Sequence, residues 1–191
     1  EAKASMTAHE WIFPLIRLAE IFGLHLASLD VRNNSEAHDA AAAQLFARVG
    51  IPDGENFPTW TEAKRREFLV AELSNPRPFL TRYEEAGDDA DHILAYFRLL
   101  ATHLRKRGPD CLGQLIISMT RSVSDILLVQ LLSREAGLAK LHSNGKWRSR
   151  LPVSPLFETG EDLAAASTIM AEYLAIMGPH PSGMQPAMVG Y

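Results

Sequence analysis

The 191-residue sequence contains a single cysteine, Cys111. One thiol cannot form an internal disulfide, and it cannot supply the several sulfur ligands of a cysteine-based zinc site. No two histidines stand at ligand spacing together with a carboxylate, so a histidine-based zinc motif is missing as well. These features exclude disulfide-stapled and zinc-finger classes, and they fit a reducing compartment, which predicts a cytoplasmic protein.

Long apolar runs and strong charge of one sign are also missing. The longest apolar run, around residues 126–132, is too short to span a membrane. The opening EAKASM does not have the basic segment and apolar core of a signal peptide. The net charge is -4 with both signs interspersed, so no basic stripe points to nucleic acid. We therefore expect neither a membrane nor a nucleic-acid partner.

Two catalytic motifs are absent. No glycine-rich phosphate loop follows any apolar run, which argues against a dinucleotide-binding sheet. No Gly-x-Ser-x-Gly motif surrounds Ser118, Ser122 or Ser124, and the sequence places no base beside them. We interpret these serines as helix caps and turn formers rather than nucleophiles.

The sequence does contain an alternation of β-like runs and helical patterns. Strands are predicted at 24–31, 113–119, 151–157 and 187–191, and the first is expected to be buried on both faces. Helices are predicted to begin at Ser35, at Thr59–Glu62, at 88, at Ser122–Asp125 and at Thr159–Asp162, mostly from capping residues. The polar stretch 138–150 is predicted to be a loop.

This order of strands separated by helices favours parallel pairing with right-handed crossovers. A (β/α) barrel and an open doubly wound sheet both satisfy it. The missing phosphate loop, and a final strand without a covering helix, favour the barrel. We expect an α/β fold, helix-rich, that forms part of a (β/α)8 TIM-type barrel with about four parallel strands. Residues 1–191 would be a single unit, with residues 1–20 as a leading helix or linker.

Polar residues follow the predicted strands, where parallel α/β folds carry their chemistry. Arg32 comes at the end of the first strand, and Glu158 directly follows the third. Arginine suits a phosphate or carboxylate, and a carboxylate suits a hard divalent metal such as Mg²⁺. The alternatives are structural: Arg32 could pair with Asp30 or Asp39, and Glu158 could cap the next helix.

Two histidines fall near this region. His25 would lie within the first strand as a packed or surface residue, without a role in the site. His38 lies in the first turn of a predicted helix, close after Arg32, and is the one histidine we expect near the rim. A supporting or helix-stabilising role is favoured over catalysis for His38, because histidine has many such roles.

Five stretches together resemble the phosphoenolpyruvate carboxylase family, and they stand in family order from residue 22 to residue 191. They are FGLHLASLDVRNNSEAHDAAAAQLF, AELSNPRPFL, IISMTRSVSDILLVQLLSREAGL, LPVSPLFETGEDLAAA and AMVGY. The resemblance implies a helix-decorated (β/α)8 barrel, usually a homotetramer. It also implies carboxylation of phosphoenolpyruvate with bicarbonate to give oxaloacetate and phosphate, using Mg²⁺ or Mn²⁺ and no biotin.

The resemblance also implies roles for two residues. Arg32 matches the arginine that holds the substrate phosphate, and Glu158 matches one of two metal-binding carboxylates. Asn33 departs from the family, which usually has glutamine there. The second metal carboxylate and a lysine would lie just beyond Tyr191, and the family's catalytic histidine and bicarbonate loop also lie outside this stretch. We therefore expect no turnover from these 191 residues alone. Alternatives are another Mg-dependent barrel lyase acting on pyruvate or enolpyruvate, or a non-catalytic degenerate scaffold.

Overall fold

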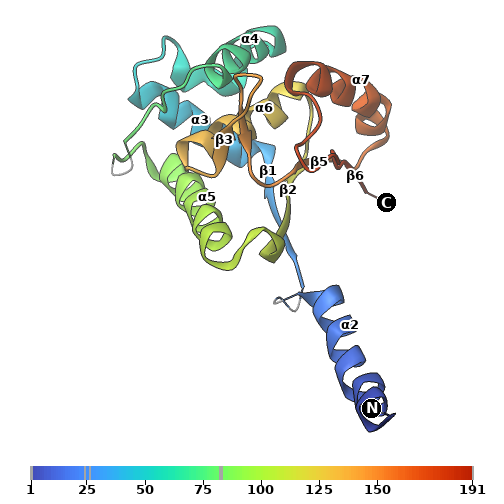
Figure 1. The fold of residues 1–191 in the computed structure, drawn as a ribbon. Helices are drawn as coiled ribbons and strands as arrows, with labels where there is room; N and C mark the ends of the chain where they lie inside the picture. The colour runs from blue at the N-terminus through green and yellow to red at the C-terminus, as the bar shows by residue number, and fades with distance from the viewer. Residues whose placement is uncertain (1, 24, 26, 82–83, 191) are drawn as a thin grey trace.

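Four strands form the main sheet of this computed structural model, which describes residues 2–23, 25, 27–81 and 84–190. They are β1 (Leu29–Asn34), β2 (Leu112–Ser118), β5 (Val153–Phe157) and β6 (Met188–Val189), in the order β1-β2-β5-β6. Every neighbouring pair is parallel. The predicted helix-rich α/β architecture with four parallel strands is therefore confirmed (Figure 1).

The first strand differs from its prediction. It begins at Leu29 rather than at residue 24; Leu24 and Leu26 lie outside the described residues, and His25 lies in a bend before the strand. The expected burial on both faces is wrong, since Leu29 is 64% exposed. The reason is position: within the described residues β1 lies at the edge of the sheet and pairs only with β2, so apolar composition does not force it into the core.

Helices surround the sheet, and α6 (Val123–Glu135) lies at the centre of them (Figure 1). All of its residues from Val123 to Arg134 are buried, which confirms the prediction of a helix apolar on nearly all sides. The helices that contact it are α3 (Ser35–Arg48), α4 (Glu62–Leu73), α5 (Asp88–Arg107) and α7 (Gly160–Met177). The core is therefore built between α6 and its neighbours as much as on the sheet.

Two predicted helix caps are shifted. The side chain of Asn34, not Ser35, accepts the backbone N–H of the first turn of α3, because the Ser35 hydroxyl donates instead to the Met119 carbonyl at 2.7 Å. Thr59 ends a short 3-10 helix, η2 (Gly54–Thr59), and Thr61 caps α4. The helices are where the sequence predicts them, and the capping residue moves by one or two positions.

The stretch predicted as a loop at 138–150 contains a β-hairpin instead. Strands β3 (Ala139–Leu141) and β4 (Trp147–Ser149) pair antiparallel around a turn at Gly145. Burial explains the difference, since the flanking Leu138 is fully buried and the N–H of Ser149 donates to the buried Gln130 side chain at 2.6 Å. Polar composition alone did not reveal this anchoring.

The N-terminal segment is helical and projects away from the rest of the chain (Figure 1). It comprises α1 (Ala2–Thr7), a π-helical stretch η1 (Ala8–Ile12) and α2 (Phe13–Phe22). Neither η1 nor α2 has a buried residue, and several large apolar side chains are exposed, including Trp11, Leu15 and Ile21. No helix in the described part of the chain is both long and apolar enough to cross a membrane.

His38 lies in the core, not at the rim where the sequence placed it. It is 2% exposed, its ring packs edge-on against Phe97 with centroids 6.0 Å apart, and neither ring nitrogen has a hydrogen-bond partner among the described residues. Burial lowers the pKa of His38 from 6.5 to about 4, and the charge of Asp125 opposes that shift only in part. His38 is thus held neutral.

This burial predicts acid sensitivity. Because the folded pKa of His38 is depressed, its contribution to stability is complete above pH 6.5 and is lost as the pH falls towards 4. The linkage amounts to about 2 kcal/mol of unfolding free energy between pH 7 and pH 4.5. Urea unfolding at both pH values measures the unfolding free energy that each protein loses on acidification. This loss should be about 2 kcal/mol smaller for His38→Leu than for the wild type. His103→Leu, at an exposed position on α5, should keep the wild-type difference.

Candidate functional site

Arg32 and Glu158 lie side by side at the carboxyl edge of the sheet. Arg32 belongs to β1 and Glu158 directly follows β5, and these strands flank β2, so parallel pairing brings both residues to the same end. The Arg32 Nη2 donates to the Glu158 Oε1 at 3.0 Å. The two side chains remain 54% and 41% exposed, so the pair faces solvent and is open to a ligand.

Two structural roles were the alternatives: an ion pair of Arg32 with Asp30 or Asp39, and a helix cap by Glu158. The structure has neither. The carboxylate of Asp30 accepts bonds from Gln114, and that of Asp39 from Arg65 and Arg121, so neither pairs with Arg32. The first turn of α7 is capped without Glu158.

That cap is the capping box predicted from the sequence, and it is confirmed. The Thr159 hydroxyl accepts the Asp162 N–H at 3.1 Å, and the Asp162 carboxylate accepts the Thr159 N–H at 3.0 Å. These bonds to Thr159 lower the pKa of Asp162. The Glu158 carboxylate is therefore not needed for the helix, and within the described residues it bonds only to Arg32.

Gly190 holds the backbone after β6 against Glu158. Its N–H donates to the Phe157 carbonyl at 2.9 Å. A Cβ at this position would lie 3.0 Å from the Cγ and 3.2 Å from the Cα of Glu158, tighter than most Cβ contacts, so Glu158 would have to shift by a few tenths of an ångström. The absence of a side chain at residue 190 therefore leaves room for the carboxylate in its observed place.

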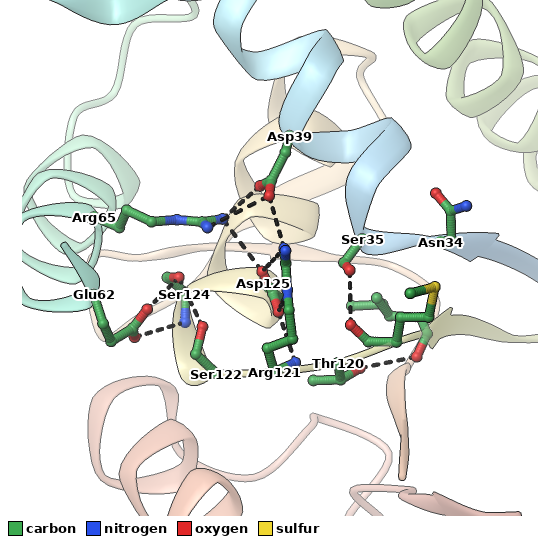
Figure 2. Close-up of polar contacts among 12 residues, drawn as sticks. Asn34, Ser35, Asp39, Glu62, Arg65, Thr120, Arg121, Ser122, Ser124 and Asp125 are labelled. Carbon is green, nitrogen blue, oxygen red and sulfur yellow. Dashed lines mark hydrogen bonds and ion pairs between the residues drawn. The ribbon is translucent and has the colours of Figure 1, made fainter. Parts of the chain in front are cut away.

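Between β1 and β5, the loop after β2 completes the edge (Figure 2). Met119 adopts a left-handed conformation with φ 58°, and the Thr120 hydroxyl donates to the Ile117 carbonyl at 2.9 Å. The Ser118 hydroxyl donates to the Asn33 carbonyl at 3.4 Å. Both hydroxyls donate to backbone carbonyls, which gives Ser118 a structural role, as the sequence predicts.

Four charged side chains form a buried ion cluster behind this edge: Asp39, Arg65, Arg121 and Asp125 (Figure 2). Arg65 Nη2 lies 2.5 Å from Asp39 and 3.2 Å from Asp125, and Arg121 Nη2 lies 2.7 Å and 3.2 Å from the same two carboxylates. All but Arg121 are nearly fully buried. The cluster ties α3, α4 and the start of α6 together.

Arg121 is the exposed member of the buried ion cluster, at 48%. Partial burial opposes its charge, but the bonds and charges of Asp125 and Asp39 outweigh this and raise the pKa of Arg121 above its ordinary value. The sequence analysis missed the cluster. Only the pair Arg121 and Asp125 has a local signal, its i, i+4 spacing; the other contacts join residues 26, 60 and 82 positions apart, for which no local spacing is a signal.

The start of α6 also differs from its prediction. Ser122 is the first flanking residue but makes no side-chain cap, so the predicted capping box with Asp125 does not form. Glu62 of α4 takes the place of the missing cap. The Glu62 carboxylate accepts the Ser124 N–H at 3.1 Å and the Ser124 hydroxyl at 2.6 Å (Figure 2). Asp125 instead accepts the Arg121 N–H at 2.8 Å.

The chemistry at this edge is an exposed cation beside an exposed carboxylate. Among the residues that the structure describes, no group of three or more histidine, cysteine, aspartate or glutamate side chains could hold a metal ion. Glu158 thus supplies one oxygen-donor group, and Arg32 supplies donors for an anion.

A comparison of the sequence with protein-family profiles identifies the family of this chain. The profile of the family described as phosphoenolpyruvate carboxylase matches residues 1–191. The chain belongs to the phosphoenolpyruvate carboxylase family. The resemblance seen in the five sequence stretches is confirmed.

Curated relatives named phosphoenolpyruvate carboxylase agree with this assignment. The chain is 36% identical to that of Roseiflexus castenholzii over 98% of its own length, 38% to that of Burkholderia vietnamiensis over 93%, and 35% to that of Rhodothermus marinus over 96%. It spans about a fifth of the length of these phosphoenolpyruvate carboxylases, 18–20%.

The buried ion cluster predicts a contrast between two adjacent arginines of α4. Arg65→Met leaves two buried carboxylates with Arg121 alone, and we expect a loss of roughly 3–5 kcal/mol of unfolding free energy. Arg66→Met removes a half-exposed pair with Glu172, 3.1 Å long, and should cost at most about 1 kcal/mol. Urea unfolding of both variants measures the difference; equal losses would show that the cluster does not stabilise the fold.

Proposed function

We propose that this chain forms part of the catalytic barrel of a phosphoenolpyruvate carboxylase, which joins bicarbonate to phosphoenolpyruvate and yields oxaloacetate and phosphate. The observation that carries the proposal is the position of Arg32 and Glu158, 3.0 Å apart at the carboxyl edge of a parallel sheet. This is where barrel enzymes hold their substrates. Family membership and identities of 35–38% support it.

Arg32 is proposed to bind the phosphate of phosphoenolpyruvate. Its guanidinium is planar and permanently charged, and it offers paired donors that match phosphate oxygens. More than half of the Arg32 side chain is exposed, and only one of the two terminal nitrogens of Arg32 donates to Glu158. The remaining donors can therefore meet an incoming phosphate without rearrangement of the strand.

Glu158 is proposed to hold Mg²⁺ or Mn²⁺. The donor set fits in part: Glu158 offers a partly exposed carboxylate, and Mg²⁺ takes only one or two carboxylates together with water and substrate oxygens. When bound, the cation would stabilise negative charge that develops on the substrate oxygen. No biotin enters this scheme.

Before substrate arrives, the two residues pair with each other. Exposed ion pairs contribute only about 0–1 kcal/mol, so the Arg32–Glu158 pair opens at little cost. A phosphate would then replace Glu158 as the partner of Arg32, and a cation would replace Arg32 as the partner of Glu158. Without a ligand, the ion pair holds both side chains at the carboxyl edge of the sheet.

The remaining expectations concern the whole enzyme and stay proposals. Within the described residues β1 and β6 each pair on one side only, which supports a sheet that other segments extend into a (β/α)8 barrel. We propose residues 1–191 as a single part of that barrel domain, with residues 1–20 as its leading helix. The intact enzyme is proposed to be a cytoplasmic homotetramer.

A segment exchange tests this function. The chain would replace the matching segment of the Roseiflexus castenholzii relative, and oxaloacetate formation would be measured in a coupled assay. We expect activity in the exchanged enzyme. Arg32→Gln should raise the KM for phosphoenolpyruvate 10- to 100-fold, because hydrogen bonds to charged groups contribute about 1.5–3 kcal/mol. Glu158→Gln should lower kcat and raise the Mg²⁺ concentration required.

Glu161→Gln is the matched control, since Glu161 is an exposed carboxylate in the first turn of α7. It should leave kcat, KM and the Mg²⁺ requirement unchanged. If Glu158→Gln behaves in the same way, Glu158 does not hold the metal. A folded exchanged enzyme without any activity would make this segment a non-catalytic scaffold.

The 191-residue chain on its own should not turn over. It spans about a fifth of its relatives and offers one carboxylate at the site, so it should bind the metal weakly. The same coupled assay, at high enzyme concentration with Mn²⁺ and bicarbonate, should give no oxaloacetate above background. Clear formation of oxaloacetate would contradict this expectation.

A further inference from the structure

A pocket away from the proposed active site is lined by several arginines. This pocket, of about 290 Å³, lies between the second half of α5, the last turn of α6 and the segment that follows α4. Helix α6 begins beside the edge that carries Arg32 and Glu158 and ends at this pocket. With 13 residues, α6 spans about 20 Å, so the pocket is a separate place from the proposed active site.

The charged residues that line the pocket are three arginines and one glutamate: Arg98, Arg105, Arg134 and Glu135. Arg134 is buried and already engaged. Its Nε donates to Glu135 at 2.7 Å, its Nη1 donates to the Glu72 carbonyl at 2.5 Å, and its guanidinium lies over the Phe79 ring at 4.8 Å. Its Nη2 also lies 3.7 Å from the Glu72 carboxylate, so Arg134 is compensated by Glu135 and Glu72 and offers no free positive charge to the pocket.

The Glu135 carboxylate is bonded to partners other than Arg98 and Arg105. One carboxylate oxygen accepts from Arg134, and the other accepts the N–H groups of Phe79 and Leu80 at 2.8 and 3.3 Å. Burial raises the pKa of Glu135, and the bonds and charge of Arg134 oppose that shift in part. Even fully ionised, this carboxylate is directed at partners other than Arg98 and Arg105.

Arg98 and Arg105 are left with uncompensated charge. Neither forms an ion pair within the described residues, and the Arg98 guanidinium has no hydrogen bond there. Arg105 donates only to the neutral hydroxyl of Thr102, at 3.1 Å. Seven residues apart, they lie on one face of α5, about 10 Å apart along its axis, so both long side chains can reach one ligand between them.

We propose that this pocket binds a small dianion of the phosphate class, inorganic phosphate or a short phosphate ester, through Arg98 and Arg105. Two uncompensated guanidinium groups match the two charges, and each can donate paired hydrogen bonds to phosphate oxygens. The apolar lining of Pro78, Leu80 and Ala136 would take a short carbon chain. Bound there, the ligand connects α5 with the end of α6.

Phosphate titration of the 191-residue chain, followed by ¹⁵N NMR at constant ionic strength with chloride, tests the site. The amide signals of Ala101, Thr102 and Gly137 should shift and saturate. Arg98→Gln combined with Arg105→Gln should weaken this binding at least tenfold. Arg105→Gln alone changes an exposed residue only, so it keeps the test valid if the double variant does not fold, and it should weaken binding several-fold.

Two controls separate this site from others. Arg107→Gln removes an exposed charge at the end of α5 that does not line the pocket, and Arg32→Gln removes the proposed substrate-binding arginine. Both should leave the saturating shifts of Ala101, Thr102 and Gly137 unchanged. The proposal is overturned if phosphate causes no saturable shift at these amides, if Arg107→Gln weakens binding as much as Arg105→Gln, or if Arg32→Gln abolishes the shifts. Retention of full affinity in both pocket variants would also overturn it.

Discussion

The buried ion cluster of Asp39, Arg65, Arg121 and Asp125 is the interaction on which the carboxyl edge of the sheet depends. Its carboxylates come from α3 and α6, the helices that directly follow β1 and β2, and Arg65 brings in α4. Buried charges hold their places strongly because losing a partner leaves a charge without compensation. The cluster thus fixes where the two strands end and where Arg32 is presented, while the Arg32–Glu158 pair itself stays exposed and weak.

Much of the fold and the central pair of the candidate site could be predicted from the sequence, because their signals are local. Alternating apolar runs and helical stripes place β2, β5, α5 and α6 where the structure has them. Thr159 and Asp162 form a capping box through spacing alone. Arg32 and Glu158 were found by the rule that parallel strands share one carboxyl edge, which turns position along the chain into proximity in space.

The remaining features depend on contacts between distant segments. An apolar run does not reveal whether its strand is central or at an edge, which is why Leu29 was expected to be buried. His38 reads as a polar residue near the rim, and only the packing of α3 against α5 places its ring against Phe97. Likewise, Glu62 caps a helix that begins about sixty residues later, a role that no local spacing signals.

Gly190 illustrates how a site can constrain sequence without taking part in chemistry. Most glycines of the chain have positive φ angles that suit their turns, whereas Gly190 is crowded instead by the backbone and side chain of Glu158. The requirement for glycine here is therefore set by a residue 32 positions earlier (190 minus 158). A larger residue at 190 would press on the Cα, Cβ and Cγ of Glu158, so the position tolerates change only as far as Glu158 can move.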